Sequence, residues 1–167
     1  MRCKKMKNMA RAALLALLFA AAPASAASGR VIGAADGDTL RVLINGASVR
    51  VRLVCIDAPE RRQAFGNRAR QALSKLVFRQ NVDLDVQGRD QYGRTLARVW
   101  LGRQDINAEM VRLGLAWMYR SQCKNEVLRE LEAEAKAARR GLWVDPSPVP
   151  PWKYRWANRR SDGKSGR

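Results

Sequence analysis

Short segments of alternating apolar and polar residues fill much of the sequence between residues 30 and 100, and they constrain the fold more than any other feature. Val49, Val51 and Leu53 alternate in this way, and the preceding Asn45-Gly46 pair is a strong signal for a tight hairpin turn. The pattern predicts five strands, one that opens at 31–33 and four at 39–44, 49–56, 82–86 and 96–100.

Helical periodicity interrupts these strands and then follows them. Apolar residues recur at helical spacing between about 62 and 79, and again from about 125 to 140, where Gly141 ends the pattern. Asp105 is a suitable N-cap for a shorter helix that Gly114 stops. Five antiparallel strands with a helix after the third predict an α+β, mainly β fold: an OB-fold five-stranded Greek-key barrel with about three helices. An SH3-like barrel fits less well because of the inserted helix.

The first 26 residues have the composition of a secretory signal peptide. A basic start is followed by a short apolar run from Ala12 to Ala22, and Ala24-Ser25-Ala26 fits the small-residue cleavage pattern. The alternative is an uncleaved membrane anchor, although the run is short for a bilayer. We therefore expect a signal peptide at 1–26, one domain at 27–145, and a secreted or periplasmic bacterial protein without stable membrane association.

The tail, residues 146–167, is proline-rich and then basic, and we expect its last eight residues to be disordered. Three aromatic residues, Trp152, Tyr154 and Trp156, alternate there with basic ones. They could stack on single-stranded nucleic acid, but packing against the barrel is the favoured alternative.

Charge and histidine content narrow the possible chemistry. The chain has 32 lysines and arginines against 15 acids, a net charge of +17, which favours polyanionic partners such as nucleic acid. It has no histidine, the commonest general base and transition-metal ligand. An enzyme of this composition would use a carboxylate as its base and a hard metal ion bound by oxygen. Cys55 and Cys123 could pair in an oxidising compartment or remain as two separate thiols.

Four acids and an arginine are grouped at two predicted strand ends. Asp36 and Asp38 lie in a turn after the first strand, and Asp57 and Glu60 follow the third. An isolated acidic turn is ordinary, but two carboxylates brought together repel unless a cation joins them, and calcium accepts such oxygens. Arg52 lies within an apolar strand, an expensive place for an unpaired guanidinium, and its fork suits two phosphate oxygens.

In this order and spacing, the motifs resemble the thermonuclease family, whose type member is staphylococcal nuclease. The resemblance covers about residues 30–143 and lies in Asp36-Gly37-Asp38-Thr39, Arg52 to Glu60, Tyr92 to Ala97, Val111 to Ala116 and Glu132 to Ala135. It implies calcium-dependent hydrolysis of DNA and RNA phosphodiester bonds on an OB-type barrel, with 3′-phosphate products.

The resemblance also implies roles for single residues. Asp38, Asp57 and the main-chain carbonyl of Ala58 match calcium ligands, with Asp36 nearby. Ala58 stands where the type member has threonine, a change that a carbonyl ligand should survive. Three further residues match the catalytic residues of the family: Arg52, Glu60 and Arg94. Glu60 could also serve only as an acid at a helix N-terminus.

Substrate contacts are less well matched. Tyr92 matches a substrate-contacting tyrosine, whereas Gln91 replaces a lysine there. The segment that carries the stacking tyrosines of the type member is shorter here, and Tyr119 is its best candidate to stack on a base. We expect a monomeric, sugar-nonspecific nuclease that prefers single-stranded or frayed DNA and RNA. The alternative is a catalytically silent OB-fold module, which would typically lack the acids or the arginines.

Overall fold

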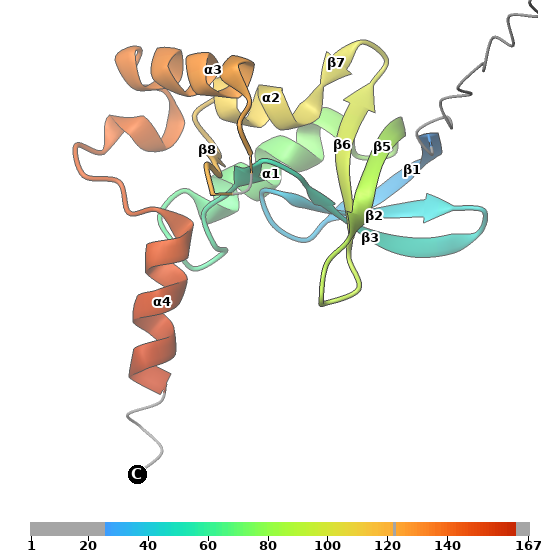
Figure 1. The fold of residues 1–167 in the computed structure, drawn as a ribbon, viewed down its shortest axis with the longest axis horizontal. Helices are drawn as coiled ribbons and strands as arrows, with labels where there is room; N and C mark the ends of the chain where they lie inside the picture. The colour runs from blue at the N-terminus through green and yellow to red at the C-terminus, as the bar shows by residue number, and fades with distance from the viewer. Residues whose placement is uncertain (1–25, 122, 163–167) are drawn as a thin grey trace, which may run out of the picture.

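The computed structural model describes residues 26–121 and 123–162 (Figure 1). Residues 1–25 of the predicted signal peptide lie outside this part. The five main strands are β1 (Ala26–Ala34), β2 (Thr39–Ile44), β3 (Ala47–Leu53), β5 (Asn81–Arg89) and β6 (Thr95–Leu101). Three two-residue strands are β4 (Ile56–Asp57), β7 (Gln104–Asp105) and β8 (Trp117–Met118).

The main strands close into a barrel, as predicted, but the closing pair is parallel. The order β3-β2-β1-β5-β6 is antiparallel throughout, and β3 then pairs with β6 in parallel, with Arg52 opposite Leu96. The expectation of five antiparallel strands was therefore wrong for this pair. Local alternation predicts a strand but not its direction against a partner more than 40 residues away.

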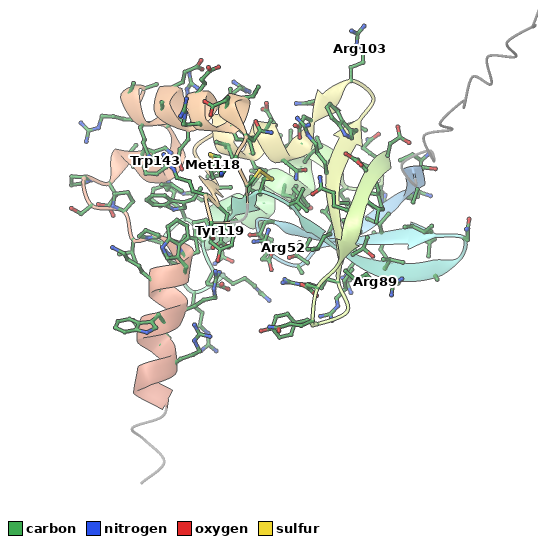
Figure 2. All side chains as sticks on the ribbon, in the orientation of Figure 1. Arg52, Arg89, Arg103, Met118, Tyr119 and Trp143 are labelled. Atoms are coloured by element: carbon green, nitrogen blue, oxygen red, sulfur yellow. A yellow bond between two sulfur atoms is a disulfide. The ribbon has the colours of Figure 1, made fainter. Side chains whose placement is uncertain are left out.

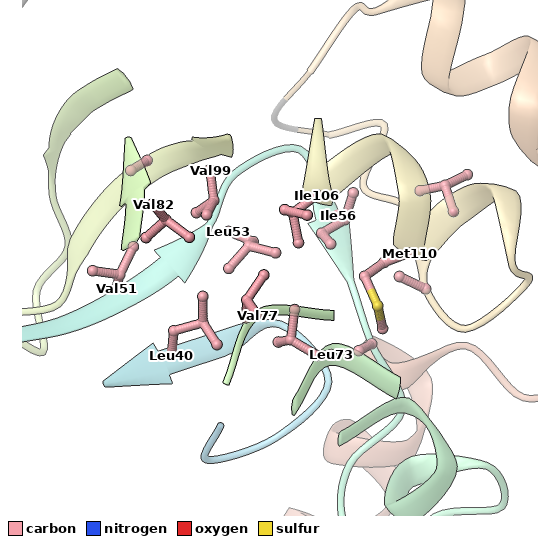
Figure 3. Close-up of a cluster of buried hydrophobic side chains, with 14 of the residues drawn as sticks. Leu40, Val51, Leu53, Ile56, Leu73, Val77, Val82, Val99, Ile106 and Met110 are labelled. Atoms are coloured by element: carbon pink, nitrogen blue, oxygen red, sulfur yellow. The ribbon is translucent and has the colours of Figure 1, made fainter. Parts of the chain in front are cut away.

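The main apolar core fills the barrel and continues beneath the helices (Figure 3), and a smaller cluster of Ala135, Leu142 and Trp143 lies beside it. Val51 and Leu53 of β3 are both fully buried. Because successive side chains of a strand point to opposite faces, Arg52 between them must point out of the barrel core. Each fully buried aliphatic side chain of this kind contributes roughly 1.5–3 kcal/mol. The core therefore fixes the orientation of Arg52.

The helices are α1 (Gly66–Val77), α2 (Ile106–Arg112), α3 (Glu126–Ala137), α4 (Pro151–Asp162) and the 3₁₀ turn η1 (Gly141–Val144). Asp105 caps α2 as predicted, since its side chain accepts a hydrogen bond from Ala108 N at 3.1 Å. Helix α1 begins later than expected, because residues 61–65 form a turn. Within the described residues, every helix is too short or too polar to cross a lipid bilayer.

Helix α4 was not predicted. It begins at Pro151, which is buried and suited to the first turn of a helix. The expected disorder of the last eight residues is wrong for 160–162, which are helical, while 163–167 lie outside the described part. Trp152 packs against Trp117 and Tyr119, with ring centroids 5.7 Å apart in both pairs. Figure 1 shows the C-terminal end of the helix projecting away from the barrel.

A disulfide joins Cys55 to Cys123. It ties the turn between β3 and β4 to the segment that precedes α3. Tyr119 N also donates a hydrogen bond of 2.8 Å to Cys55 O in the same region. The short strand β4, which carries Asp57, is therefore held in two ways: by the disulfide at the preceding Cys55 and by its pairing with β8.

Candidate active site

Two buried carboxylates meet at the mouth of the barrel. Asp38 precedes β2 and Asp57 ends β4, and they are 5% and 1% exposed. Ala58 N donates a hydrogen bond of 2.7 Å to Asp38 Oδ2, which links the two strand ends directly. Asp36 lies at the entrance and accepts a hydrogen bond from Asp38 N at 3.0 Å. The structure thus brings together three of the predicted acids.

Arg52, labelled in Figure 2, contacts both of these carboxylates. Its Nη2 is 3.1 Å from Asp38 Oδ2 and 3.1 Å from Asp57 Oδ1. Its Nη1 donates to the carbonyl oxygens of Leu53 at 2.6 Å and Ile56 at 2.9 Å. Because both terminal nitrogens of Arg52 are engaged by oxygen atoms, the orientation of its guanidinium is fixed.

Burial raises the proton affinity of both acids. Desolvation raises the pKa of Asp38 from 3.8 to about 6, although Arg52 acts in the opposite direction. Burial likewise raises the pKa of Asp57 above its ordinary value, while the neighbouring arginines lower it. Two carboxylates with these surroundings gain from a further cation, which would favour their ionised form.

Glu60 is positioned by a close backbone contact. A Cβ atom at Gly66 would lie 1.8 Å from Glu60 O, so only glycine allows α1 to begin against this turn. Glu60 N donates a hydrogen bond of 3.2 Å to Gln63 Oε1. The Glu60 side chain is 39% exposed and therefore reaches solvent at the edge of the cluster.

A sixth charged residue of this cluster was not predicted as a site residue. Arg155, from α4, places Nη1 3.1 Å from Asp57 Oδ1 and 2.8 Å from Glu60 Oε1. Its Nη2 lies 2.8 Å from Asp57 Oδ2. Arg155 is one of 32 basic residues, and only the fold of the tail distinguishes it from the others.

Arg94 lies apart from these contacts. Its Nε donates to Asp90 Oδ2 at 2.7 Å, and its guanidinium lies 5.6 Å from the ring centroid of Tyr92. Among the described residues, its hydrogen bonds, ion pair and ring contact all stay within the turn between β5 and β6. The adjacent Thr95 nevertheless pairs with Val51, next to Arg52. The fold thus brings this turn alongside the cluster but directs the Arg94 side chain elsewhere.

The two tyrosines predicted to contact substrate differ in exposure. Tyr92 is 65% exposed in the β5–β6 turn. The ring of Tyr119 (labelled in Figure 2) lies against Trp152 of α4 and borders a cavity between β8, α3 and α4. Tyr119 is therefore in contact with the tail helix.

An open groove adjoins the cluster. It has a volume of about 440 Å³ and lies between the turn after β4 and α4. Its lining residues are mainly charged or polar: Asp36, Glu60, Arg61, Arg62, Tyr154, Arg155, Asn158 and Arg159. A groove lined by these basic side chains can accept a phosphodiester backbone beside the two buried acids.

The donor atoms of the cluster suit a hard cation. In the described part of the chain, no three histidine, cysteine or acidic side chains are grouped closely enough to hold a metal by themselves. Asp38 and Asp57 offer carboxylate oxygens, the ligands that calcium accepts together with carbonyls and water. Arg155 already contacts Asp57 as a cation. The chemistry fits calcium, provided that Arg155 moves.

Comparisons with known proteins agree with this geometry. Residues 50–145 match the family described as Staphylococcal nuclease homologue. Over 166 residues the chain is 48% identical to Protein ParB of Escherichia coli, covering 91% of this chain and 94% of that protein. It is 46% identical to a Micrococcal nuclease of Shigella flexneri, with 80% and 83% covered. It is also 44% identical to an Uncharacterized endonuclease of Haemophilus influenzae, with 75% and 71% covered.

Proposed function

The chain belongs to the staphylococcal nuclease homologue family and is a nuclease, and from this premise we propose an exported, calcium-dependent enzyme that hydrolyses DNA and RNA to 3′-phosphate products. One observation carries the proposal. Arg52 is fixed between two buried carboxylates, and Glu60 lies within reach of the same cluster. A cation site, a phosphate-binding charge and a candidate base are thereby adjacent.

Arg52 is suited to stabilise negative charge on a phosphate. Its position is fixed before substrate arrives, so little reorganisation is needed when charge develops. Arg94 would have to leave Asp90 to add a second guanidinium. The adjacent Thr95 pairs with Val51 of β3, so the Arg94 backbone already lies near Arg52.

Glu60 is the candidate general base. Of the two acids that Arg155 contacts, Glu60 is the more exposed, and so the one that a water molecule can approach. With no histidine in the chain, a carboxylate must accept the proton of the attacking water. Asp38, Asp57 and the Ala58 carbonyl would hold calcium, which supplies positive charge that stabilises the transition state.

The surroundings support a nucleic-acid substrate. Arg61, Arg62 and Arg159 line the groove beside Glu60 and can contact backbone phosphates. Tyr92 is exposed enough to stack on a base, which favours single-stranded or frayed substrate. Because the contacts are mainly ionic, binding should weaken steeply as salt is raised. We propose that the enzyme acts as a monomer.

Export is supported by two independent features. The signal-like segment at 1–26 precedes the barrel, and the Cys55–Cys123 disulfide is a bond that persists in oxidising compartments. We therefore propose a secreted or periplasmic location. Fractionation of cells that express the full chain tests it, since retention of an uncleaved product in the cytoplasm would contradict the proposal.

A cleavage assay tests the function itself. Denatured DNA and RNA are incubated with the protein, with calcium or with a calcium chelator, and the ends of the products are identified. The proposal expects cleavage with calcium only, and at least a hundredfold loss in Arg52→Ala and Glu60→Ala. Arg103→Ala is a matched control, because Arg103 lies on the β6–β7 hairpin far from the cluster (Figure 2). Chelator-resistant cleavage would exclude the calcium role.

A further inference from the structure

We propose that Arg155 is an internal competitor for the metal: it closes the cluster by binding Asp57 and Glu60, and it must leave before calcium binds. The inference rests on the calcium site proposed above. It assigns Arg155 and α4 the role of setting how much calcium the site requires. Nothing in the family match covers this residue, since the match ends at residue 145.

Arg155 occupies, as a cation, one of the two carboxylates proposed to bind calcium. Arg155 contacts both carboxylate oxygens of Asp57, at 3.1 and 2.8 Å, and one of Glu60 at 2.8 Å. Paired N–H donors on a carboxylate are among the strongest charge-assisted hydrogen bonds. While they persist, the lone pairs of Asp57 that face Arg155 are not directed at a metal, and one oxygen of Glu60 is occupied. The structure therefore shows a closed arrangement of the site.

The charge balance explains why the arginine is held there. Four acids surround the mouth of the barrel, namely Asp36, Asp38, Asp57 and Glu60. Arg52 is the cation that the barrel itself contributes to Asp38 and Asp57. The excess negative charge in a partly buried region attracts a second cation. Arg155 is that second cation here, and calcium carries twice its charge into the same position.

Arg155 is carried by a helix outside the barrel, so it can leave the cluster without disturbing the barrel core. Beyond Arg155, the described contacts that dock the segment 149–162 include the Trp152 ring contacts and a 2.5 Å hydrogen bond from Gln63 Nε2 to Val149 O. The side chains of Arg155 and Glu60 are 38% and 39% exposed, so their ion pair faces water and is screened, whereas Asp57 is only 1% exposed. The guanidinium also borders the open groove, which gives it somewhere to move without unfolding the barrel.

Calcium titration calorimetry on the full chain without nucleic acid tests the competition. We expect Arg155→Ala to bind calcium roughly tenfold more tightly than the unmodified protein, or about 1.4 kcal/mol. Lys153→Ala is the matched control, because it removes the same charge from an exposed position on the same helix. Arg155→Lys keeps the charge without the fork and should give an intermediate affinity.

The outcomes separate this inference from the function it rests on. If Arg155→Ala and Lys153→Ala bind calcium with equal affinity and that affinity matches the unmodified protein, the competition is refuted while the calcium site stands. If no variant binds calcium, both ideas fail together, and the cleavage assay then shows whether nuclease activity survives without the metal.

A second readout follows the helix instead of the metal. Calcium should accelerate amide hydrogen exchange in residues 151–162 of the unmodified protein, because binding releases Arg155 and loosens α4. Exchange that slows on adding calcium would overturn the inference. So would loss of cleavage by Arg155→Ala at saturating calcium, since Arg155 would then be a permanent part of the working site.

Discussion

Two arginines reach the same carboxylate from very different parts of the molecule. Arg52 is built into β3 between two fully buried residues and its side chain is 14% exposed, whereas Arg155 comes from a terminal helix and is 38% exposed. Both contact Asp57 at about hydrogen-bonding distance. The same ion-pair chemistry is thus anchored in two different ways, by a barrel strand for Arg52 and by a terminal helix for Arg155.

The most direct test of this difference removes each guanidinium in turn. Arg52→Met should lower the free energy of unfolding by about 3–5 kcal/mol, because it leaves two buried carboxylates without their shared partner. Arg155→Met should change it by less than about 1 kcal/mol, because Asp57 keeps Arg52 as a partner and the Arg155–Glu60 pair is exposed. Urea unfolding of both variants, without calcium, measures the two values. Equal losses would show that the two arginines belong to one rigid unit.

Breaking the disulfide tests how firmly the barrel side of the cluster is held. Cys55 lies two residues before Asp57, and its bond to Cys123 closes a long loop. The double variant Cys55→Ser/Cys123→Ser should lose about 2–4 kcal/mol of unfolding free energy. Adding reductant to the unmodified protein should reproduce most of this loss. If reductant has no effect and the variant is unchanged, the bond does not form in solution.

The buried acid Asp38, which contacts Arg52, allows a pH-dependent test of the barrel side of the cluster. Its folded-state pKa of about 6 lies above the unfolded value of 3.8, so the fold favours the protonated form. The stability that this group contributes is fully present below pH 3.8 and is lost as pH rises through about 6. Asp38→Asn, which stays neutral, should therefore be more stable than the unmodified protein at pH 8 by about 1–3 kcal/mol.

Denaturant unfolding in the presence of chelator measures this difference at pH 4 and pH 8. The gap between Asp38→Asn and the unmodified protein should close at the lower pH, where both side chains are neutral. Asp83→Asn, at an exposed position on β5, is the control and should show no such trend. A less stable Asp38→Asn at pH 8 would mean that Arg52 more than offsets the cost of burying the charge.

The difference between Arg52 on a barrel strand and Arg155 on the terminal helix also separates what the sequence could predict from what it could not. The strand at Thr39–Ile44 and the cap at Asp105 follow from local patterns, and the structure confirms both. The acids after β1 and β3 could be grouped in advance because they lie at the ends of strands that a barrel brings together. The parallel direction of β3 against β6 could not be predicted, because no local sequence signal specifies a distant partner strand.

Arg155 marks the limit of such reasoning. Its neighbours Trp152 and Tyr154 were noticed as an aromatic and basic pattern, but the pattern left two roles open. Its position depends on where α4 docks, which is decided by ring contacts with Trp117 and Tyr119 that involve distant residues. Tertiary contacts of this kind leave no periodic trace in the sequence.

The smallest expected effect comes from loosening α4 without touching a charge. Trp152→Ala removes the ring contacts that dock the helix, so residues 151–162 should exchange amide hydrogens at least tenfold faster. The barrel should lose less than about 1 kcal/mol, because its core does not include Trp152. Hydrogen exchange followed by mass spectrometry separates the two regions, with Lys153→Ala as the control. If strand β2 loses protection together with α4, the helix is part of the cooperative fold, and the distinction between a fixed and a removable arginine collapses.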